Sequence, residues 1–365
     1  MLILFILLLL FFGFILFVIM LSKRPQGWLH PILAFGLFLS QNDNAIDDDR
    51  PVEKKRQESE ALLRSVHGRL PQIPVENTTI VLKDKEYKVR LYKPATPSAK
   101  SVLYFHGGGF VLGNLEAYDN ICRWLCYYGN IEVMSFDYPL APENPFPIPV
   151  EAAYQAYNWY FEEKSKTWDK AEIFLCGDSA GGNLSTSVAL MACQKGNTPP
   201  QALCLLYPAL DMTRLDNHAY QSYSKGFLLS KSDILYFRKQ YLPHESDWNH
   251  PYVSPLNHPI PANMPPCLIL TAQFDILSQE GQEFAQKLKA ANIPVEYKMY
   301  KGVAHGFMTI THLLGTSHRA IRHTAAFINS NHRFKPSLLE KFSNRDRVNK
   351  FGLKKQSKQT ISNCL

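Results

Sequence analysis

The chain has 365 residues, of which 46% are hydrophobic and 19% charged, a composition that excludes disordered and collagen-like proteins and suits one large catalytic domain with additions or two small domains. The formal net charge is +7, but seven basic residues and one acidic residue after position 340 supply +6 of it. The rest of the chain is therefore nearly neutral, which argues against a nucleic-acid partner, because nucleic-acid enzymes carry a basic surface on the folded domain.

The first 21 residues carry no charged side chain. As a helix they extend roughly 32 Å, enough to cross the hydrocarbon core of a bilayer. A cleaved signal peptide is the competing interpretation, but the segment has no basic start, no A-x-A-like cleavage site and too long an apolar run. We therefore predict a membrane anchor over residues 1–21. Lys23 and Arg24 follow it, so the positive-inside rule predicts that the rest of the chain faces the cytoplasm.

Residues 22–75 are expected to form a linker and an N-terminal cap segment. Within them, residues 27–40 are apolar but too short to span a bilayer, and we expect them to lie at the membrane or to cover the active site of the following domain. The charged residues 41–60 indicate a linker that enters a helix over 58–67. Next, two alternating runs, 79–83 and 87–92, predict a β-hairpin.

Strands and helices then alternate as far as residue 331. The expected strands are 101–105, 131–136, 173–176, 202–206, 267–271 and 295–300. The expected helices are 115–128, 150–164, 184–192, 280–291 and 320–331. Repeated strand–helix units imply a mostly parallel sheet with helices on both faces, whose reactive groups lie beyond the carboxyl ends of the strands.

Residues 211–265 interrupt this alternation. They are rich in Tyr, Asn, His and Pro and contain a helical pattern near 232–241. Because the interruption is too long for a simple loop, it predicts a helical cap that packs with the chain before residue 75. We expect a catalytic domain over 76–333 and a basic tail over 334–365, which is either a solvated end or a contact for acidic lipid.

The seven cysteines indicate free thiols. Their number is odd, and Cys176, Cys204 and Cys267 lie in apolar strand-like runs, so we expect buried thiols in a reducing compartment rather than a disulfide framework. Cys122 and Cys126 lack the further Cys or His ligands that a metal site requires, so no metal site is expected.

Residues 177–183 read G-D-S-A-G-G-N, between an apolar run and a helical pattern. Strand, tight turn and helix form the context of a G-x-S-x-G nucleophile elbow, in which the serine is exposed on a sharp turn. An ordinary strand-to-helix turn is the alternative for the motif alone. We interpret Ser179 as a nucleophile because of the two motifs that accompany it.

The first accompanying motif is H-G-G-G-F at residues 106–110, directly after the strand 101–105. Consecutive glycines leave backbone N–H groups free to stabilise an oxyanion. A phosphate-binding loop is the alternative, but it requires a Lys-Ser or Lys-Thr pair that is absent here. We expect donors among Gly107, Gly108, Gly109 and Ala180, the last being the residue after the nucleophile.

Asp275 and His305 form the second accompanying pattern, because each follows the end of an expected strand. An aspartate in this place can orient a histidine and stabilise its imidazolium form. The chain order Ser179, Asp275, His305 is the order of α/β-hydrolases. All three side chains are therefore expected to converge at one edge of the sheet.

Together these motifs resemble the hormone-sensitive-lipase-like (family IV) carboxylesterases of the α/β-hydrolase fold, which include arylacetamide-deacetylase relatives. The resemblance covers about residues 75–330 and includes D-Y-P-L-A-P-E at 137–143, D-I-L at 275–277 and A-H-G-F at 304–307. The chain departs from the family pattern at Pro139, where an arginine is usual, and in the segment after Asp275.

The resemblance implies a serine carboxylesterase or lipase that hydrolyses short- to medium-chain acyl esters through an acyl-enzyme, with no metal or organic cofactor. The implied substrate is a small-molecule or lipid ester. Two alternatives remain: a non-catalytic receptor on the same fold, which is expected to lack a triad member, and an amide deacetylase or acyltransferase that uses the same residues.

Overall fold

A computed structural model describes residues 1–40 and 50–330 and contains an eight-stranded sheet in the order β10-β9-β8-β7-β5-β6-β4-β3. The six strands from β10 to β6 are parallel to one another, and β4 and β3 add an antiparallel edge. The strands are β3 Val75–Leu82, β4 Lys85–Tyr92, β5 Lys100–Phe105, β6 Glu132–Phe136, β7 Glu172–Asp178, β8 Ala202–Leu206, β9 Cys267–Phe274 and β10 Val295–Ala304. The predicted mostly parallel sheet is confirmed.

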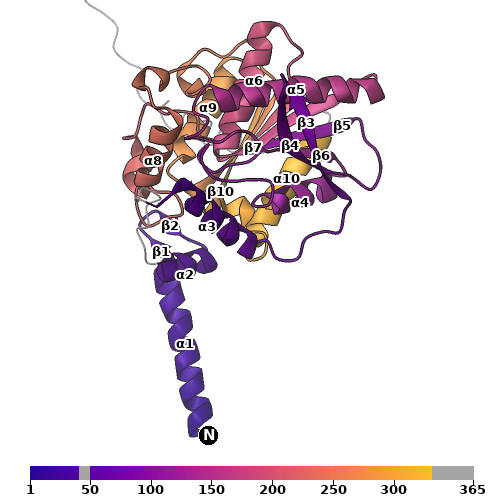
Figure 1. The fold of residues 1–365 in the computed structure, drawn as a ribbon. Coiled ribbons are helices and arrows are strands. Elements are labelled where there is room, and N and C mark those ends of the chain that lie inside the picture. Colours follow the sequence, from indigo (N-terminus) through magenta and orange to yellow (C-terminus); the bar gives the residue numbers. More distant parts are fainter. Residues whose placement is uncertain (41–49, 331–365) are drawn as a thin grey trace, which may run out of the picture. The chain divides into compact units, whose positions relative to one another are not determined.

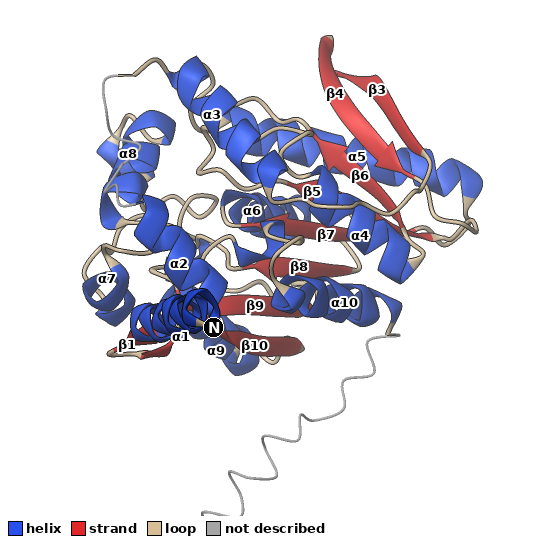
Figure 2. Cartoon of the chain, turned by 90° about the horizontal axis from the view of Figure 1, so that it is seen from below, coloured by secondary structure: helices blue, strands red, loops and turns tan. Residues whose placement is uncertain are grey.

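Helices cover both faces of this sheet, as the alternating pattern predicted (Figures 1 and 2). In Figure 1, α5, α6 and α9 lie above the sheet, and α4 and α10 lie below it. Their bounds are α4 Asp119–Gly129, α5 Ile148–Thr167, α6 Ala180–Lys195, α9 Ser278–Ala290 and α10 Gly315–Asn329. Because both faces are covered, central strands such as β8 are buried along their whole length.

The β3–β4 hairpin is longer than the predicted one. Leu82 pairs with Lys85, which leaves Lys83 and Asp84 as a two-residue turn, both with positive φ. Such turns match the twist of the flanking strands, so backbone pairing continues past the residues that alternate in polarity.

The predicted bounds are also too short where polar or glycine residues continue an element. β10 runs four residues beyond its expected end, through a register shift between Tyr300 and Ala304 that includes Gly302 with φ 74°. α10 begins five residues early, and its added first turn includes the buried Ser317, whose hydroxyl donates to the carbonyl of Phe307. A search for apolar periodicity does not detect either extension.

The N-terminal residues form α1 (Leu2–Ser22), a two-strand hairpin of β1 (Lys23–Arg24) and β2 (Gly27–Trp28), and α2 (Pro31–Ser40). By length and composition, α1 is the one helix within the described residues that could cross a membrane. Aromatic pairs join α1 to α2, with ring centres 5.3 Å apart for Phe14 and Phe35. The second apolar run is therefore a helix that packs on the first.

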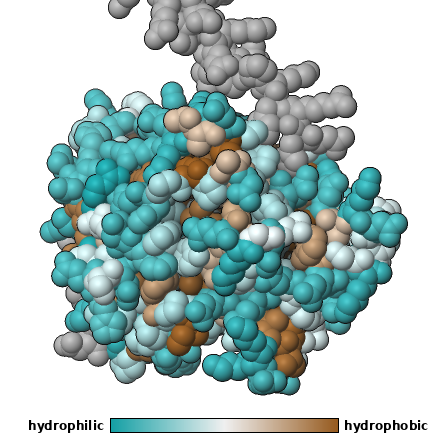
Figure 3. Space-filling model, turned by 90° about the horizontal axis from the view of Figure 1, so that it is seen from above, coloured by the Kyte–Doolittle hydropathy of each residue, from teal (hydrophilic) through white to brown (hydrophobic). Residues whose placement is uncertain are grey.

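Most side chains of α1 are apolar and exposed. The face seen from above in Figure 3 is mainly hydrophilic, with separated hydrophobic patches. Scattered patches of this kind are ordinary for a protein face in contact with water.

The cap insertion contains α7 (His218–Tyr223) and α8 (Lys231–Tyr241), of which only α8 was predicted. Ser230 and Asp233 form a capping box that fixes the start of α8. The helix α3 (Val52–Ser65) packs on α8, with the Lys55 ammonium 4.3 Å from the centre of the Tyr236 ring. α3 begins six residues earlier than expected, and the linker residues 41–49 lie outside the described residues.

The six described cysteines are free, and five of them are buried, as predicted. Cys364 and the basic tail lie outside the described residues. The remaining domain limits stay predictions, because the chain from Met1 to Ser330 forms one compact unit.

Candidate active site

Ser179 lies on a sharp turn between β7 and α6, in the strained conformation φ 54° and ψ −117°. The turn requires glycine on both sides. A Cβ atom at Gly177 would collide with the carbonyl of Gly181, and a Cβ atom at Gly181 would collide with the carbonyl of Phe105. A strained backbone between crowded glycines is the geometry of a nucleophile elbow, with the serine lifted off the end of the sheet.

The structure brings together the three residues predicted from the ends of β7, β9 and β10. The Ser179 hydroxyl lies 2.9 Å from Nε2 of His305, and Nδ1 of His305 lies 2.9 Å from Oδ2 of Asp275. Asp275 is buried, and its Oδ1 accepts the backbone N–H of Leu277 at 2.8 Å. The arrangement can pass a proton from the hydroxyl to the imidazole while the carboxylate holds the ring.

Gly108 and Gly109 both have positive φ, and Gly109 lines the same pocket as Ser179. A Cβ atom at Gly109 would collide with the ring of Phe237 from α8. Within the described residues, the N–H groups of Gly108, Gly109 and Ala180 have no hydrogen-bond acceptor. These three donors are available to a charged oxygen.

The N–H of Gly107, in contrast, donates to Oδ1 of Asp178 at 2.8 Å. A donor already engaged inside the protein is not free for an oxyanion, so this contact argues against the expected role of Gly107. The hydroxyl of Tyr104 donates to the same oxygen at 2.7 Å. Burial raises the pKa of Asp178 to about 6, although these two hydrogen bonds and the nearby His305 partly oppose the rise.

Asp178 therefore ties the donor loop to the elbow, a role that motif reading missed. It occupies the variable position of G-x-S-x-G, and the available signal was an acidic residue inside a buried turn. Asn183, the last residue of the quoted motif, was missed as well. Its amide donates to the carbonyls of Ala209 and Val253, which joins α6 to the chain just before the cap insertion and to a residue within it.

His106 supports the donor loop from below. Its ring stacks on Tyr138, with centres 4.3 Å apart, and on Tyr118 at 5.4 Å. Nδ1 donates to the carbonyl of Gly107 at 2.8 Å. Burial lowers the pKa of His106 to about 4, so the ring is neutral at physiological pH and is not placed to exchange protons with Ser179.

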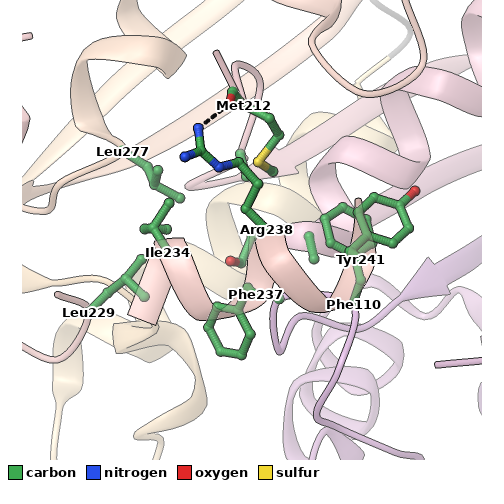
Figure 4. Close-up of a pocket in the computed structure, with 12 residues that line it drawn as sticks. Phe110, Met212, Leu229, Ile234, Phe237, Arg238, Tyr241 and Leu277 are labelled. Carbon is green, nitrogen blue, oxygen red and sulfur yellow. Dashed lines mark hydrogen bonds between the residues drawn. The ribbon is translucent and has the colours of Figure 1, made fainter. Parts of the chain in front are cut away.

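Ser179 lies in the wall of a pocket. Figure 4 shows the side chains that line this pocket. Its walls combine the donor loop with the cap, and α8 supplies Ile234, Phe237, Arg238 and Tyr241. The other lining residues are Gly109, Phe110, Ser179, Ala180, Ala209, Met212, Leu229 and Leu277. The lining is mostly apolar, which suits the hydrocarbon part of a small ligand.

Comparison with known proteins identifies the family. Residues 102–309 match a protein family whose description is alpha/beta hydrolase fold. The carboxylic ester hydrolase LipN of Mycobacterium tuberculosis is 37% identical over 283 residues, which cover 75% of this chain and 74% of that protein. This chain belongs to the α/β-hydrolase family. It is a carboxylic ester hydrolase.

Other relatives of this esterase agree. An ethyl acetate hydrolase of Pseudomonas putida is 32% identical over 60% of this chain and 71% of that protein. Among solved structures, an esterase of Pyrobaculum calidifontis superposes with a TM-score of 0.77 at 34% identity, over 83% of this chain and 98% of the other. The resemblance drawn from the motifs is thereby confirmed.

Proposed function

We propose that this esterase hydrolyses short- to medium-chain acyl esters through an acyl-enzyme on Ser179, with His305 as general base and acid and Asp275 as its partner. The observation that carries the proposal is the unbroken hydrogen-bond series from the hydroxyl through the imidazole to the carboxylate, 2.9 Å at each step. Gly109 and Ala180 line the same pocket as Ser179, and their N–H groups, like that of Gly108, have no acceptor within the described part of the chain.

In the acylation step, the Ser179 oxygen attacks the carbonyl carbon of the ester while Nε2 of His305 takes the hydroxyl proton. The carbonyl π electrons move to the oxygen, and the negative charge is stabilised by the three N–H donors. Collapse of this intermediate breaks the bond to the alcohol. His305 returns the proton to the leaving oxygen, and the alcohol departs.

In the deacylation step, a water molecule replaces the alcohol. His305 takes one proton from the water as the water oxygen attacks the acyl carbon, and the same donors bind the second oxyanion. Collapse breaks the bond to Ser179, which receives the proton from His305. The carboxylic acid leaves, and the enzyme returns to its starting state.

The acyl-length proposal is supported by the pocket and by a relative. The pocket beside Ser179 is lined mostly by apolar side chains, and α8 forms one of its walls, which favours a short or medium acyl chain. One relative is named for the hydrolysis of ethyl acetate. Amide hydrolysis would use the same residues with a poorer leaving group. Matched ester and amide substrates with the same acyl chain separate the two activities.

Ser179→Ala tests the nucleophile. We expect kcat for a short acyl ester to fall by about 10⁴-fold or more, since removal of a triad serine abolishes covalent catalysis. A matched control is Ser185→Ala, six residues further along the chain in α6, whose hydroxyl donates to the carbonyl of Gly181 and not to His305. Circular dichroism checks that both variants fold, and a covalent serine probe should label the control alone. An active Ser179→Ala variant would reject Ser179 as the nucleophile.

We also propose that α1 anchors the enzyme in a membrane with the catalytic domain on the cytoplasmic side. The exposed apolar surface of α1 and the two basic residues Lys23 and Arg24 that follow it support this placement. A membrane-bound esterase meets lipophilic esters at high local concentration, so membrane-dissolved esters are proposed substrates.

A further inference from the structure

The residues that connect α1 to α2 lie against the ends of β9 and β10. Asp275 directly follows β9, and His305 directly follows β10. We call residues 23–30 the neck segment. Nε2 of Gln273 donates to the neck carbonyl of Gln26 at 3.0 Å, while Oε1 of the same side chain accepts the N–H of Gly302 at 2.9 Å. One amide therefore joins β9, β10 and the neck segment.

A second contact holds Gly302 from the other side. The N–H of His30 donates to the carbonyl of Gly302 at 2.8 Å. This approach depends on glycine, because a Cβ atom at Gly302 would lie 3.3 Å from the carbonyl oxygen of Trp28, and because φ is 74° there. Both backbone polar groups of Gly302 are thus paired with Gln273 or with the neck segment.

These contacts lie two or three residues from the catalytic pair. Gln273 precedes Asp275 by two residues, and Gly302 precedes His305 by three. Between Tyr300 and Ala304 the regular ladder of β10 on β9 is interrupted by a register shift. The Gln273 bridge and the neck segment hold β10 where its own strand pairing does not.

We propose that the neck segment is part of the active-site scaffold, and that Gln273 is a positioning residue that aligns His305 with Asp275 through Gly302. The inference rests on the proposed triad. It makes residues 23–30 necessary for the turnover of every ester, including esters dissolved in water, and not only a connection to a membrane.

The test uses the full-length chain in detergent and a water-soluble short acyl ester. Gln273→Met removes both hydrogen bonds at similar volume, and Gln273→Glu retains an acceptor for Gly302 but cannot donate to Gln26. We expect kcat per active site to fall about tenfold or more in both variants, with KM within twofold, since a small misplacement of catalytic groups has effects of this size. Titration with a covalent serine probe counts the active sites, so partial unfolding does not imitate the effect.

The matched control is Gln286→Met, an exposed glutamine of α9 that lines the same surface groove as Gln273. It should leave kcat and KM unchanged. If Gln273→Glu keeps the wild-type kcat, the bond to the neck segment does not position the triad, and the proposal is wrong. If Gln273→Met loses only active sites, with normal kcat per site, the bridge is merely structural and the proposal is equally wrong. Failure of the triad itself would instead appear as an active Ser179→Ala variant.

Discussion

Two buried ionisable residues, His106 and Asp178, contact the donor loop, and burial shifts their pKa values in opposite directions. The pKa of His106 is lowered to about 4, and that of Asp178 is raised to about 6. The fold therefore favours the neutral form of both groups. Nε2 of His106 has no hydrogen-bond partner among the described residues, so a proton there would be buried without an acceptor.

Replacement of His106 by Phe should remove an acid-sensitive contribution to stability. In the unfolded chain His106 binds a proton below about pH 6.5, whereas in the folded chain it binds one only below about pH 4. Between these two pH values the unfolded chain therefore holds more protons, and the free energy of unfolding falls as the pH decreases. The contribution is complete above pH 6.5, and its loss amounts to at most about 3 kcal/mol. Asp178 acts in the opposite sense over an overlapping range, which flattens the wild-type curve.

Urea unfolding of wild type and His106→Phe at several pH values between 4 and 7 measures this effect. Asp178 is common to both proteins and cancels in their difference. We expect the stability advantage of the wild type to decrease steadily toward pH 4. Parallel pH curves for the two proteins would show that His106 is not held neutral by the fold.

At the scale of elements, α8 determines the shape of the pocket. The helix is held in place by its capping box and by the packing of α3 against Tyr236. Its Phe237 ring covers Gly109 so closely that no side chain fits at that position. The same ring therefore closes one wall of the pocket and keeps the donor loop in its conformation.

Phe237→Ala should shift acyl preference toward longer chains, because it opens the wall beside Ser179. Each methylene that gains a buried place contributes about 0.8 kcal/mol. We expect the ratio of kcat/KM for a hexanoate ester to that for an acetate ester to rise about tenfold. The control is Leu235→Ala, which lies on the same helix but is 40% exposed and does not line the pocket. An equal ratio in both variants would show that α8 does not limit acyl length.

At the scale of the whole molecule, the apolar helix, the neck segment and the proposed catalytic residues belong to one compact unit. α1 ends at Ser22, whose carbonyl accepts the N–H of Leu29, so no flexible spacer separates α1 from the neck segment. In a membrane, this connection would hold the pocket at a constant height above the lipid surface. Substrate access would then depend on where an ester resides in the bilayer.

The anchor and its orientation can be tested with the full chain expressed in eukaryotic cells. We expect the protein to remain with membranes after alkaline carbonate extraction, and to retain its first 21 residues by intact mass. Protease added to sealed microsomes should digest the catalytic domain. Asn77, an exposed glycosylation acceptor on β3, should carry no glycan.

The outcomes separate the alternatives. A mature protein that lacks its N-terminal residues would identify a cleaved signal peptide. A glycosidase-sensitive mass at Asn77, abolished by Asn77→Gln, would place the catalytic domain in the lumen and overturn the cytoplasmic orientation.

Much of the fold and of the candidate site follows from local pattern. Ser179, Asp275 and His305 were each predicted because they follow an apolar strand, and parallel strands end at the same edge of a sheet. The helix α8 and the glycine loop were found for similar local reasons. Apolar periodicity predicts the bounds of an element less well where that element continues through polar or glycine residues, as β10 does at Gly302 and α10 does at Ser317.

The amino-acid sequence alone determined the fold class, the reaction class and the chain order of the proposed reacting groups, because these depend on each residue's place relative to its own strand. The tertiary structure decided that the N–H of Gly107 donates to Asp178 and that Phe237 closes the pocket over Gly109. It also decided that Gln273 joins the neck segment to β10. The hydrogen bonds among these contacts link residues 29 to 247 positions apart in the sequence. No local pattern encodes such pairs, since they arise only when the packed sheet brings distant segments into contact.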